Sequence, residues 1–181
     1  MVTRVEPAEL RLLSELLGVP DAGALALLQD AAAHWPWLAA PLAELAQMPL
    51  DRWQGEHTRL FIAGYPRTPC PPFASSWAER RMHGSAMEAL SRFYAELGLE
   101  TTHMPADFLG TILECAALLA QEDAGGEMQA RLWREHLLPW LPEFTAALAR
   151  ESTVGIYRVL AQRLDAAIHE QRLATTAAGA A

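Results

Sequence analysis

The stretch EPAELRLLSELLG, residues 6–18, carries the pattern that decides the fold class. Its leucines recur at helical spacing and share one face, while charged residues occupy the other. Pro7 suits a first helical turn, where its missing N–H would have had no partner within the helix. Gly18 is typical of a residue just beyond a helix end. The stretch therefore predicts an amphipathic helix. The leucines of its apolar face are Leu10, Leu13, Leu16 and Leu17.

The same periodicity continues along nearly the whole chain. Helices are expected over residues 22–35, 36–47, 49–62, 75–84, 85–97, 105–122, 128–140, 142–152 and 153–173. No stretch alternates as a strand would, and no repeat recurs at a fixed period. The sequence predicts an all-α fold, a single-domain compact bundle of about eight to ten helices. We assign this domain to residues 1–172 and expect 173–181 to be a disordered tail.

Capping signals refine the expected helix ends. Asp21 precedes an apolar run and is expected to cap the helix over residues 22–35. Ser85 and Glu88 have the S-x-x-E spacing of a capping box, which predicts a helix that starts at Ser85. Gly98 is expected to end that helix.

Composition narrows the possible partners. The chain has 181 residues and a net charge of −8, so nucleic acid is not an expected partner, whereas basic protein segments are. All 14 basic residues are arginine, and the absence of lysine excludes a phosphate-binding GxxxxGK[ST] loop. Cys70 and Cys115 lack C-x-x-C spacing; we expect reduced thiols, with a single disulfide as the alternative.

The sequence also bears on location. The N-terminal stretch alternates charge with leucine and lacks the apolar core of a signal peptide. No run reaches the ~18 apolar residues that a membrane-spanning helix needs. We therefore expect a cytoplasmic protein without stable membrane insertion.

The segment YPRTPCPPFASSW, residues 65–77, differs from the rest of the chain because it combines four prolines with three aromatic residues. Prolines lower the entropy lost when a loop is ordered, and aromatic side chains beside them can serve as rigid apolar anchors. One interpretation is a loop that grips a peptide segment of another protein. The other is a loop that simply packs over the bundle.

Catalytic and metal-binding patterns are scarce. The six histidines are spread along the chain, and neither H-E-x-x-H nor G-x-S-x-G occurs, so no catalytic or metal site is expected. Asp107 and Glu114 are two helical turns apart and would share one helix face. They could form a paired-carboxylate site, or Asp107 could interact with the helix dipole in a first turn after Pro105. The alternative to a binding protein is thus a small all-α hydrolase that uses Asp107, Glu114 and a histidine.

Three segments, taken together, resemble the TorD/DmsD/NarJ family of redox-enzyme maturation chaperones, and most closely its DmsD/TorD branch. EHTRLFIAGYPRTPCPPFASSW (56–77) is similar to the family's R-L-F segment followed by P-P-aromatic-x-S. MPADFLGTILECAALLAQE (104–122) resembles its P-x-D-H signature followed by an apolar helix. REHLLPWLPEFTAAL (134–148) resembles its H-L-x-x-W-x-x-x-F pattern. The order and spacing of the three agree.

The resemblance implies an all-helical cytoplasmic chaperone that is not an enzyme and has no cofactor. Such a protein binds the precursor of the catalytic subunit of a molybdopterin-containing oxidoreductase, often through its twin-arginine signal peptide. It holds this client until cofactor insertion and assembly are complete, and so delays export. We expect a monomer, with a helix-swapped dimer as an open alternative.

The resemblance also implies which residues bind the peptide. Asp107 would contact an arginine of the signal peptide, and Phe73, Trp77 and Phe108 would form an apolar wall. Phe108 stands where the family usually has histidine, which leaves open a chaperone that binds mature regions of its client instead. The implied peptide-binding residues are Leu60, Phe61, Pro72, Phe73, Ser76, Trp77, Asp107 and Phe108.

Overall fold

The computed structural model describes residues 5–80, 84–101, 103–122 and 126–178. Within these ranges the chain is helical, and its only β-type pairing is one isolated antiparallel bridge, between Phe73 and Phe108. This confirms the predicted all-α bundle. In chain order the elements are α1 (Pro7–Glu15), α2 (Ala24–Ala31), the 3-10 helix η1 (Pro36–Leu38), α3 (Ala39–Leu45), α4 (Leu50–Phe61), α5 (Ala74–Ala78), α6 (Ser85–Glu96), α7 (Leu109–Glu122), α8 (Glu127–Leu132), the π-helical turn η2 (Trp133–Leu137), α9 (Leu141–Glu151) and α10 (Gly155–Ala178).

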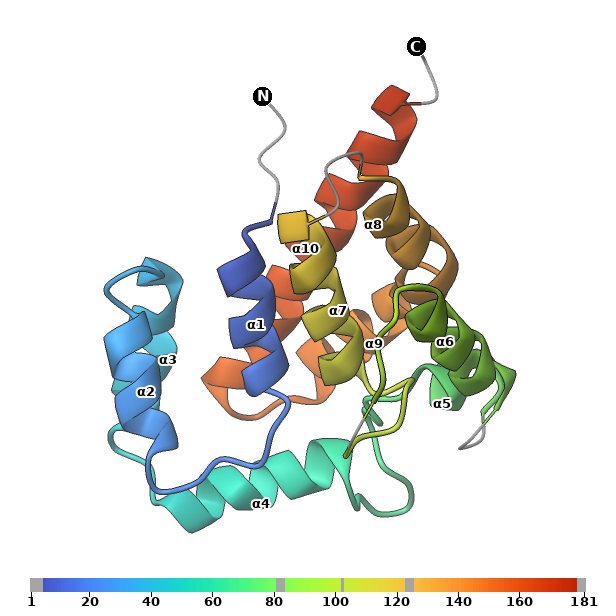
Figure 1. Ribbon diagram of the computed structural model, residues 1–181. Helices are drawn as coiled ribbons and strands as arrows, with labels where there is room; N and C mark the ends of the chain where they lie inside the picture. The colour runs from blue at the N-terminus through green and yellow to red at the C-terminus, as the bar shows by residue number, and fades with distance from the viewer. Residues whose placement is uncertain (1–4, 81–83, 102, 123–125, 179–181) are drawn as a thin grey trace.

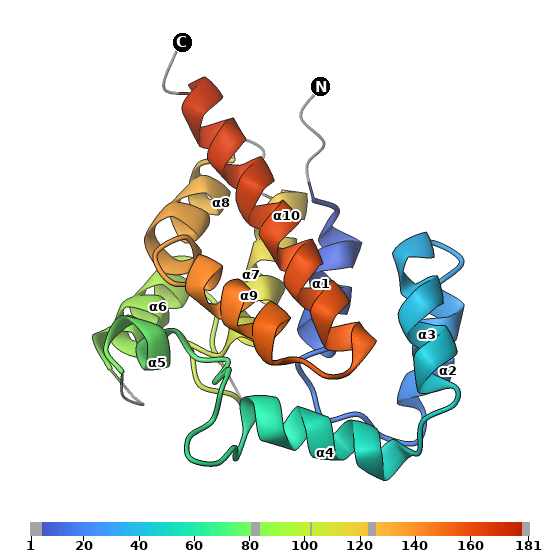
Figure 2. The ribbon, with the colours of Figure 1, turned by 180° about the vertical axis from the view of Figure 1, so that it is seen from behind.

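The helices are arranged around α7 and α10. Helix α1 packs along α7, and α9 runs beside α10, as the two opposite views show (Figures 1 and 2). Helices α2 and α3 form a pair at the side, where α3 contacts α10. Helix α4 crosses the base of the bundle in both views, between this pair and the proline-rich loop (Figure 1).

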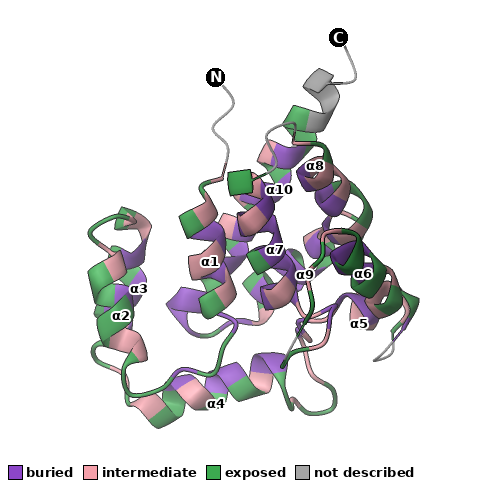
Figure 3. Ribbon diagram, viewed as in Figure 1, coloured by how far each residue is buried: buried purple, intermediate pink, exposed green. Residues whose placement is uncertain are grey.

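The core follows the predicted apolar faces. Helix α4 buries the face that looks toward the bundle, and its opposite face is exposed (Figure 3). Helix α7 buries eight of its 14 residues, with α1 and α8 packed against it. The largest fully buried side chains come from helices distant in the sequence. They are Trp133, Tyr157, Phe93 and Phe144.

The start of α7 differs from the prediction. The helix begins at Leu109, and the Phe108 N–H donates to the Pro105 carbonyl (3.1 Å) in a turn that precedes it. Asp107 therefore lies outside the helix and does not share a helix face with Glu114, so the expected first-turn position and the paired-carboxylate arrangement are both wrong. The reason is the bridge to the proline-rich loop, whose hydrogen bonds use the Asp107 carbonyl and the Leu109 N–H.

Two capping predictions also need correction. The first turn of α6 is capped by Glu79, whose Oε1 accepts hydrogen bonds from the Ala86 N–H (3.0 Å) and the Ser85 hydroxyl (3.1 Å), so the expected pairing of Ser85 with Glu88 is replaced. Asp21 accepts from the Gly23 N–H (2.8 Å), but this bond closes a turn ahead of α2.

The C-terminal helix is longer than expected. Helix α10 continues to Ala178, so residues 173–178 of the expected tail are helical, which suits the high helix propensity of alanine. The last three residues of that expected tail, 179–181, lie outside the described residues.

Candidate functional site

A groove of about 360 Å³ opens where three parts of the chain meet. Its walls are the end of α1 (Ser14 and Glu15) with residues 17–19 just after it, the C-terminal part of α4, and the pair of segments joined by the β-bridge. Helix α4 contributes His57 and Phe61, with Ile62 directly after the helix. Most of the lining side chains are apolar, so the groove suits an apolar ligand segment.

The rim of the groove exposes large apolar side chains. Val19 is 59% exposed, Ile62 56% and Met104 44%. These three residues come from separate parts of the chain and all line the same groove. Nearby in sequence, Tyr65 in the proline-rich loop is 99% exposed. Exposed apolar side chains gathered around a groove are typical of an interaction surface.

The β-bridge joins the two sequence motifs at one wall of the groove. The Leu109 N–H donates to the Pro72 carbonyl (2.8 Å), and the Ala74 N–H donates to the Asp107 carbonyl (3.0 Å). The rings of Phe73 and Phe108 lie 5.6 Å apart between their centroids and both line the groove. The two motifs therefore form one continuous apolar wall.

Four of the eight residues that the resemblance implied line this groove. They are Phe61, Pro72, Phe73 and Phe108. Leu60 is fully buried in the core. Trp77 is half-buried, packs edge-on against Phe144 at 5.9 Å and donates its indole N–H to the Pro71 carbonyl (2.8 Å). Neither Leu60 nor Trp77 lines the groove.

Asp107 and Ser76 do not line the groove either, but both contact the start of α5. Asp107 is buried, and its carboxylate accepts a hydrogen bond from the Ser75 N–H (3.1 Å) at the start of α5. The Ser76 N–H donates to the Phe73 carbonyl (3.1 Å) in the first turn of the same helix. The structure therefore brings the eight residues into one region, with Asp107 committed to α5.

Sequence reasoning missed the contribution of α1 and the side chain of His57. The imidazole Nε2 lies 3.1 Å from the Leu17 carbonyl, which can only accept, so Nε2 carries the proton. Burial lowers the pKa of His57, and the hydrogen bond to Leu17 opposes this shift. His57 lines the same groove as Phe108, the residue that replaces the histidine usual in the family. Val19 and Ile62 could have indicated the groove from the sequence, because both are apolar residues that follow the end of a helix.

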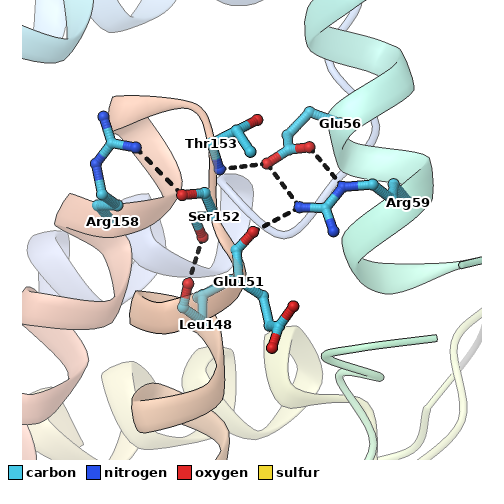
Figure 4. A network of polar contacts seen from close by, with 7 residues as sticks. All are labelled: Glu56, Arg59, Leu148, Glu151, Ser152, Thr153 and Arg158. Carbon is cyan, nitrogen blue, oxygen red and sulfur yellow. Dashed lines mark hydrogen bonds and ion pairs between the residues drawn. The ribbon is translucent and has the colours of Figure 1, made fainter. Parts of the chain in front are cut away.

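A polar cluster fixes α4 against the turn between α9 and α10 (Figure 4). Arg59 donates Nε to one Glu56 oxygen (2.8 Å) and Nη2 to the other (3.0 Å). Arg59 also donates to the Glu151 carbonyl (2.6 Å), and Glu56 accepts from the Thr153 N–H (2.6 Å). Burial alone would raise the pKa of Glu56, but the hydrogen bonds from Arg59 and Thr153 outweigh it and lower the pKa. The cluster holds the helix that presents Phe61 to the groove.

The geometry does not favour the hydrolase alternative. A second cleft of about 300 Å³ contains Glu114, which lies 3.9 Å from the guanidinium of Arg11. This cleft contains no histidine, and Asp107 lines neither cleft. Among the described residues, no three His, Cys, Asp or Glu side chains are grouped so that they could hold a metal ion. Neither cleft therefore brings Asp107, Glu114 and a histidine together.

Both cysteines behave as the sequence suggested. Cys70 and Cys115 are free and buried. Burial raises the pKa of each thiol to about 12. Since the thiolate is the reactive form, neither residue supplies a nucleophile at neutral pH.

Comparison with known proteins agrees with the sequence signatures. Residues 22–146 match the family described as nitrate reductase delta subunit. The chaperone protein YcdY of Escherichia coli (strain K12) is 30% identical over 134 residues, which cover 72% of this chain and 70% of that protein.

The fold is shared with a solved structure. A crystal structure from Archaeoglobus fulgidus, described as a candidate redox enzyme maturation protein, matches with a TM-score of 0.67 and 24% identity, over 88% of this chain and 93% of that one. Within the described residues, no helix is long and apolar enough to cross a membrane. From the family match, the identity to YcdY and the sequence signatures, we conclude that the chain belongs to the nitrate reductase delta subunit family of NarJ/TorD-type redox-enzyme maturation chaperones.

Proposed function

We propose that this chaperone binds the precursor of a molybdopterin-containing oxidoreductase catalytic subunit through its twin-arginine signal peptide. It holds the precursor in the cytoplasm until the cofactor is inserted and the subunit is assembled. The observation that carries the proposal is the apolar groove of about 360 Å³ whose rim exposes Val19, Ile62 and Met104. Its wall is formed by the two motifs that the family signatures contain.

The groove has the chemistry that the apolar stretch of a signal peptide requires. Burying one large apolar side chain of a ligand contributes about 1.5–3 kcal/mol, from which the cost of ordering both partners is subtracted. The wall is already ordered, because the bridge between Phe73 and Phe108 and the Asp107 hydrogen bond fix it. A preformed wall lowers that ordering cost and favours binding of an extended or helical peptide.

The surface charge favours encounter with a basic segment. The net charge of −8 attracts a peptide that begins with two arginines, and salt should weaken this attraction. We therefore expect the association rate to fall as the salt concentration rises. The dissociation rate, which depends on the apolar contacts, should change less.

A pull-down with the tagged chaperone from its native cells, followed by mass spectrometry, tests the proposal. We expect a molybdopterin enzyme precursor that keeps its signal peptide. Ile62→Gln should reduce the yield, because it places a polar group on the groove rim. Leu27→Gln should not, since Leu27 is 70% exposed on α2 and does not line the groove.

Two outcomes would contradict the proposal. Capture of only the mature enzyme would mean that the chaperone recognises mature regions of its client. If no redox enzyme were captured under growth conditions that induce such enzymes, the client would not be a molybdopterin-containing oxidoreductase.

A further inference from the structure

The side chains that line the groove have already used their hydrogen-bond donors, whereas some of their acceptors are unpartnered. The Ser14 hydroxyl donates to the Gly110 carbonyl (3.1 Å), and the His57 Nε2–H donates to the Leu17 carbonyl. Two acceptors remain without a partner among the described residues. One is His57 Nδ1, which is buried, and the other is the carboxylate of Glu15. A ligand that offers donors and no acceptors complements such a groove.

Glu15 occupies a position that helix energetics disfavour. It is the last residue of α1, where the helix dipole is negative and where a cation would be stabilising. The last turn of α1 contains no basic residue to compensate it. Glu15 is exposed on the rim, beside apolar residues such as Val19. A charge that breaks a local rule of helix stability at the edge of a groove marks a candidate functional residue.

We propose that Glu15 binds a guanidinium group of the client segment and so makes the groove selective for arginine. The inference rests on the proposed function, because it concerns the same groove. Guanidinium carries five N–H donors and no acceptor, and it pairs with a carboxylate through two parallel hydrogen bonds. His57, which lines the same groove, is 2% exposed and keeps an unpartnered Nδ1, a second unsatisfied acceptor in the groove lining. Asp107, which the family signature implied for this role, already accepts the Ser75 N–H.

Two fluorescent synthetic peptides test the proposal by anisotropy titration. The first carries two arginines followed by an apolar Leu/Ala segment. The second replaces both arginines with citrulline, which has nearly the same shape and no charge. The wild-type protein should prefer the arginine peptide by about fivefold, the scale of one partly desolvated charge-assisted contact. Glu15→Gln should lower this preference to about twofold or less.

Glu122→Gln is the matched control. Glu122 is the exposed last residue of α7 and does not line the groove, so its substitution removes the same charge from the same kind of helix position. It should keep the wild-type preference. Thermal unfolding should show that Glu15→Gln is at least as stable as the wild type, since it removes an unfavourable charge from the end of α1.

The outcomes separate this inference from the proposed function. If the wild type binds both peptides equally, or if Glu15→Gln keeps the full preference for arginine, Glu15 does not select arginine, although the groove still binds an apolar peptide. If the wild type binds neither peptide while it captures its client from cells, peptide recognition in the groove fails and the inference fails with it.

Discussion

The Asp107 carboxylate accepts a hydrogen bond from the backbone N–H of Ser75 at 3.1 Å, across 32 residues of chain. The Asp107 carbonyl also accepts the N–H of Ala74 at 3.0 Å. Both donors belong to the first turn of α5, whose N–H groups have no partner within that helix. Asp107 therefore acts as a helix cap supplied by a distant segment, and it fastens the proline-rich loop to the start of α7.

Replacing this cap should destabilise the fold. Asp107→Ala leaves the buried Ser75 N–H without an acceptor, and we expect the free energy of unfolding to fall by about 1–3 kcal/mol. Urea denaturation followed by circular dichroism measures the change. Asp165→Ala, at an exposed position of α10, should change it by less than about 0.5 kcal/mol. An Asp107→Ala protein of wild-type stability that no longer distinguished arginine from citrulline peptides would instead assign Asp107 to recognition.

Gly110 sets the position of the Phe108 ring on the groove wall. A Cβ at position 110 would lie 2.4 Å from Cε1 of Phe108, so Gly110→Ala must displace the ring. We expect this overpacking to lower the free energy of unfolding by about 1–3 kcal/mol and to weaken binding of the arginine peptide.

Gly55→Ala provides the comparison for Gly110→Ala. Position 55 is also inside a helix, α4, but a Cβ there would meet nothing within 4 Å. Alanine should therefore stabilise the protein by about 0.5–1 kcal/mol through its helix propensity, with peptide binding unchanged. Equal effects of the two substitutions would show that Phe108 does not depend on Gly110.

The Arg59 cluster should contribute more than an exposed ion pair. Arg59→Ala removes the partner of the buried Glu56 carboxylate and a bond to the Glu151 carbonyl. The Arg59 side chain is 38% exposed, so we discount the cost for a fully buried pair and expect a loss of about 2–3 kcal/mol in denaturant unfolding. Arg150→Ala breaks an exposed pair with the Glu151 side chain and should cost less than about 1 kcal/mol. Similar losses for both variants would mean that the cluster is screened by solvent.

Acid should destabilise the protein through His57. Burial lowers the pKa of this imidazole from its ordinary 6.5, so below that pH the unfolded state binds more protons than the folded state. The His57 contribution to stability is therefore fully present above pH 6.5, and it is lost as the pH drops toward the lowered folded pKa, by at most about 1.4 kcal/mol per pH unit for one proton.

His57→Gln tests this pH dependence because its amide can still donate to the Leu17 carbonyl. Denaturant unfolding at neutral and at mildly acidic pH should show a smaller acid loss in this variant than in the wild type. His103→Gln changes an exposed histidine outside the groove and should keep the wild-type pH dependence. An unchanged acid loss in His57→Gln would assign the effect to other groups, among them His136, whose pKa is also lowered by burial.

The sequence predicted the groove in part. Phe61, Phe73 and Phe108 were identified through motifs whose residues are close to one another in the chain. Glu15 and His57 were missed as groove residues, because nothing in their own segments indicates that the end of α1 lies beside the end of α4. Asp107 belongs to a motif that the sequence identified, but the sequence placed it in the first turn of α7. The structure places it before that helix, because it pairs with Ser75 of another segment.

The sequence alone determined the helices, the faces that they bury and the family to which the chain belongs. These features depend on local spacing: apolar residues at a period of 3.6, and glycine or proline near helix ends. Only the tertiary structure decided which carboxylates accept backbone N–H groups from other segments and which do not. Glu79, Asp107 and Glu56 each accept backbone N–H groups of other segments, while Glu15 accepts none. Such pairings depend on how the helices pack against one another, and the residue spacing within a single segment does not predict that packing.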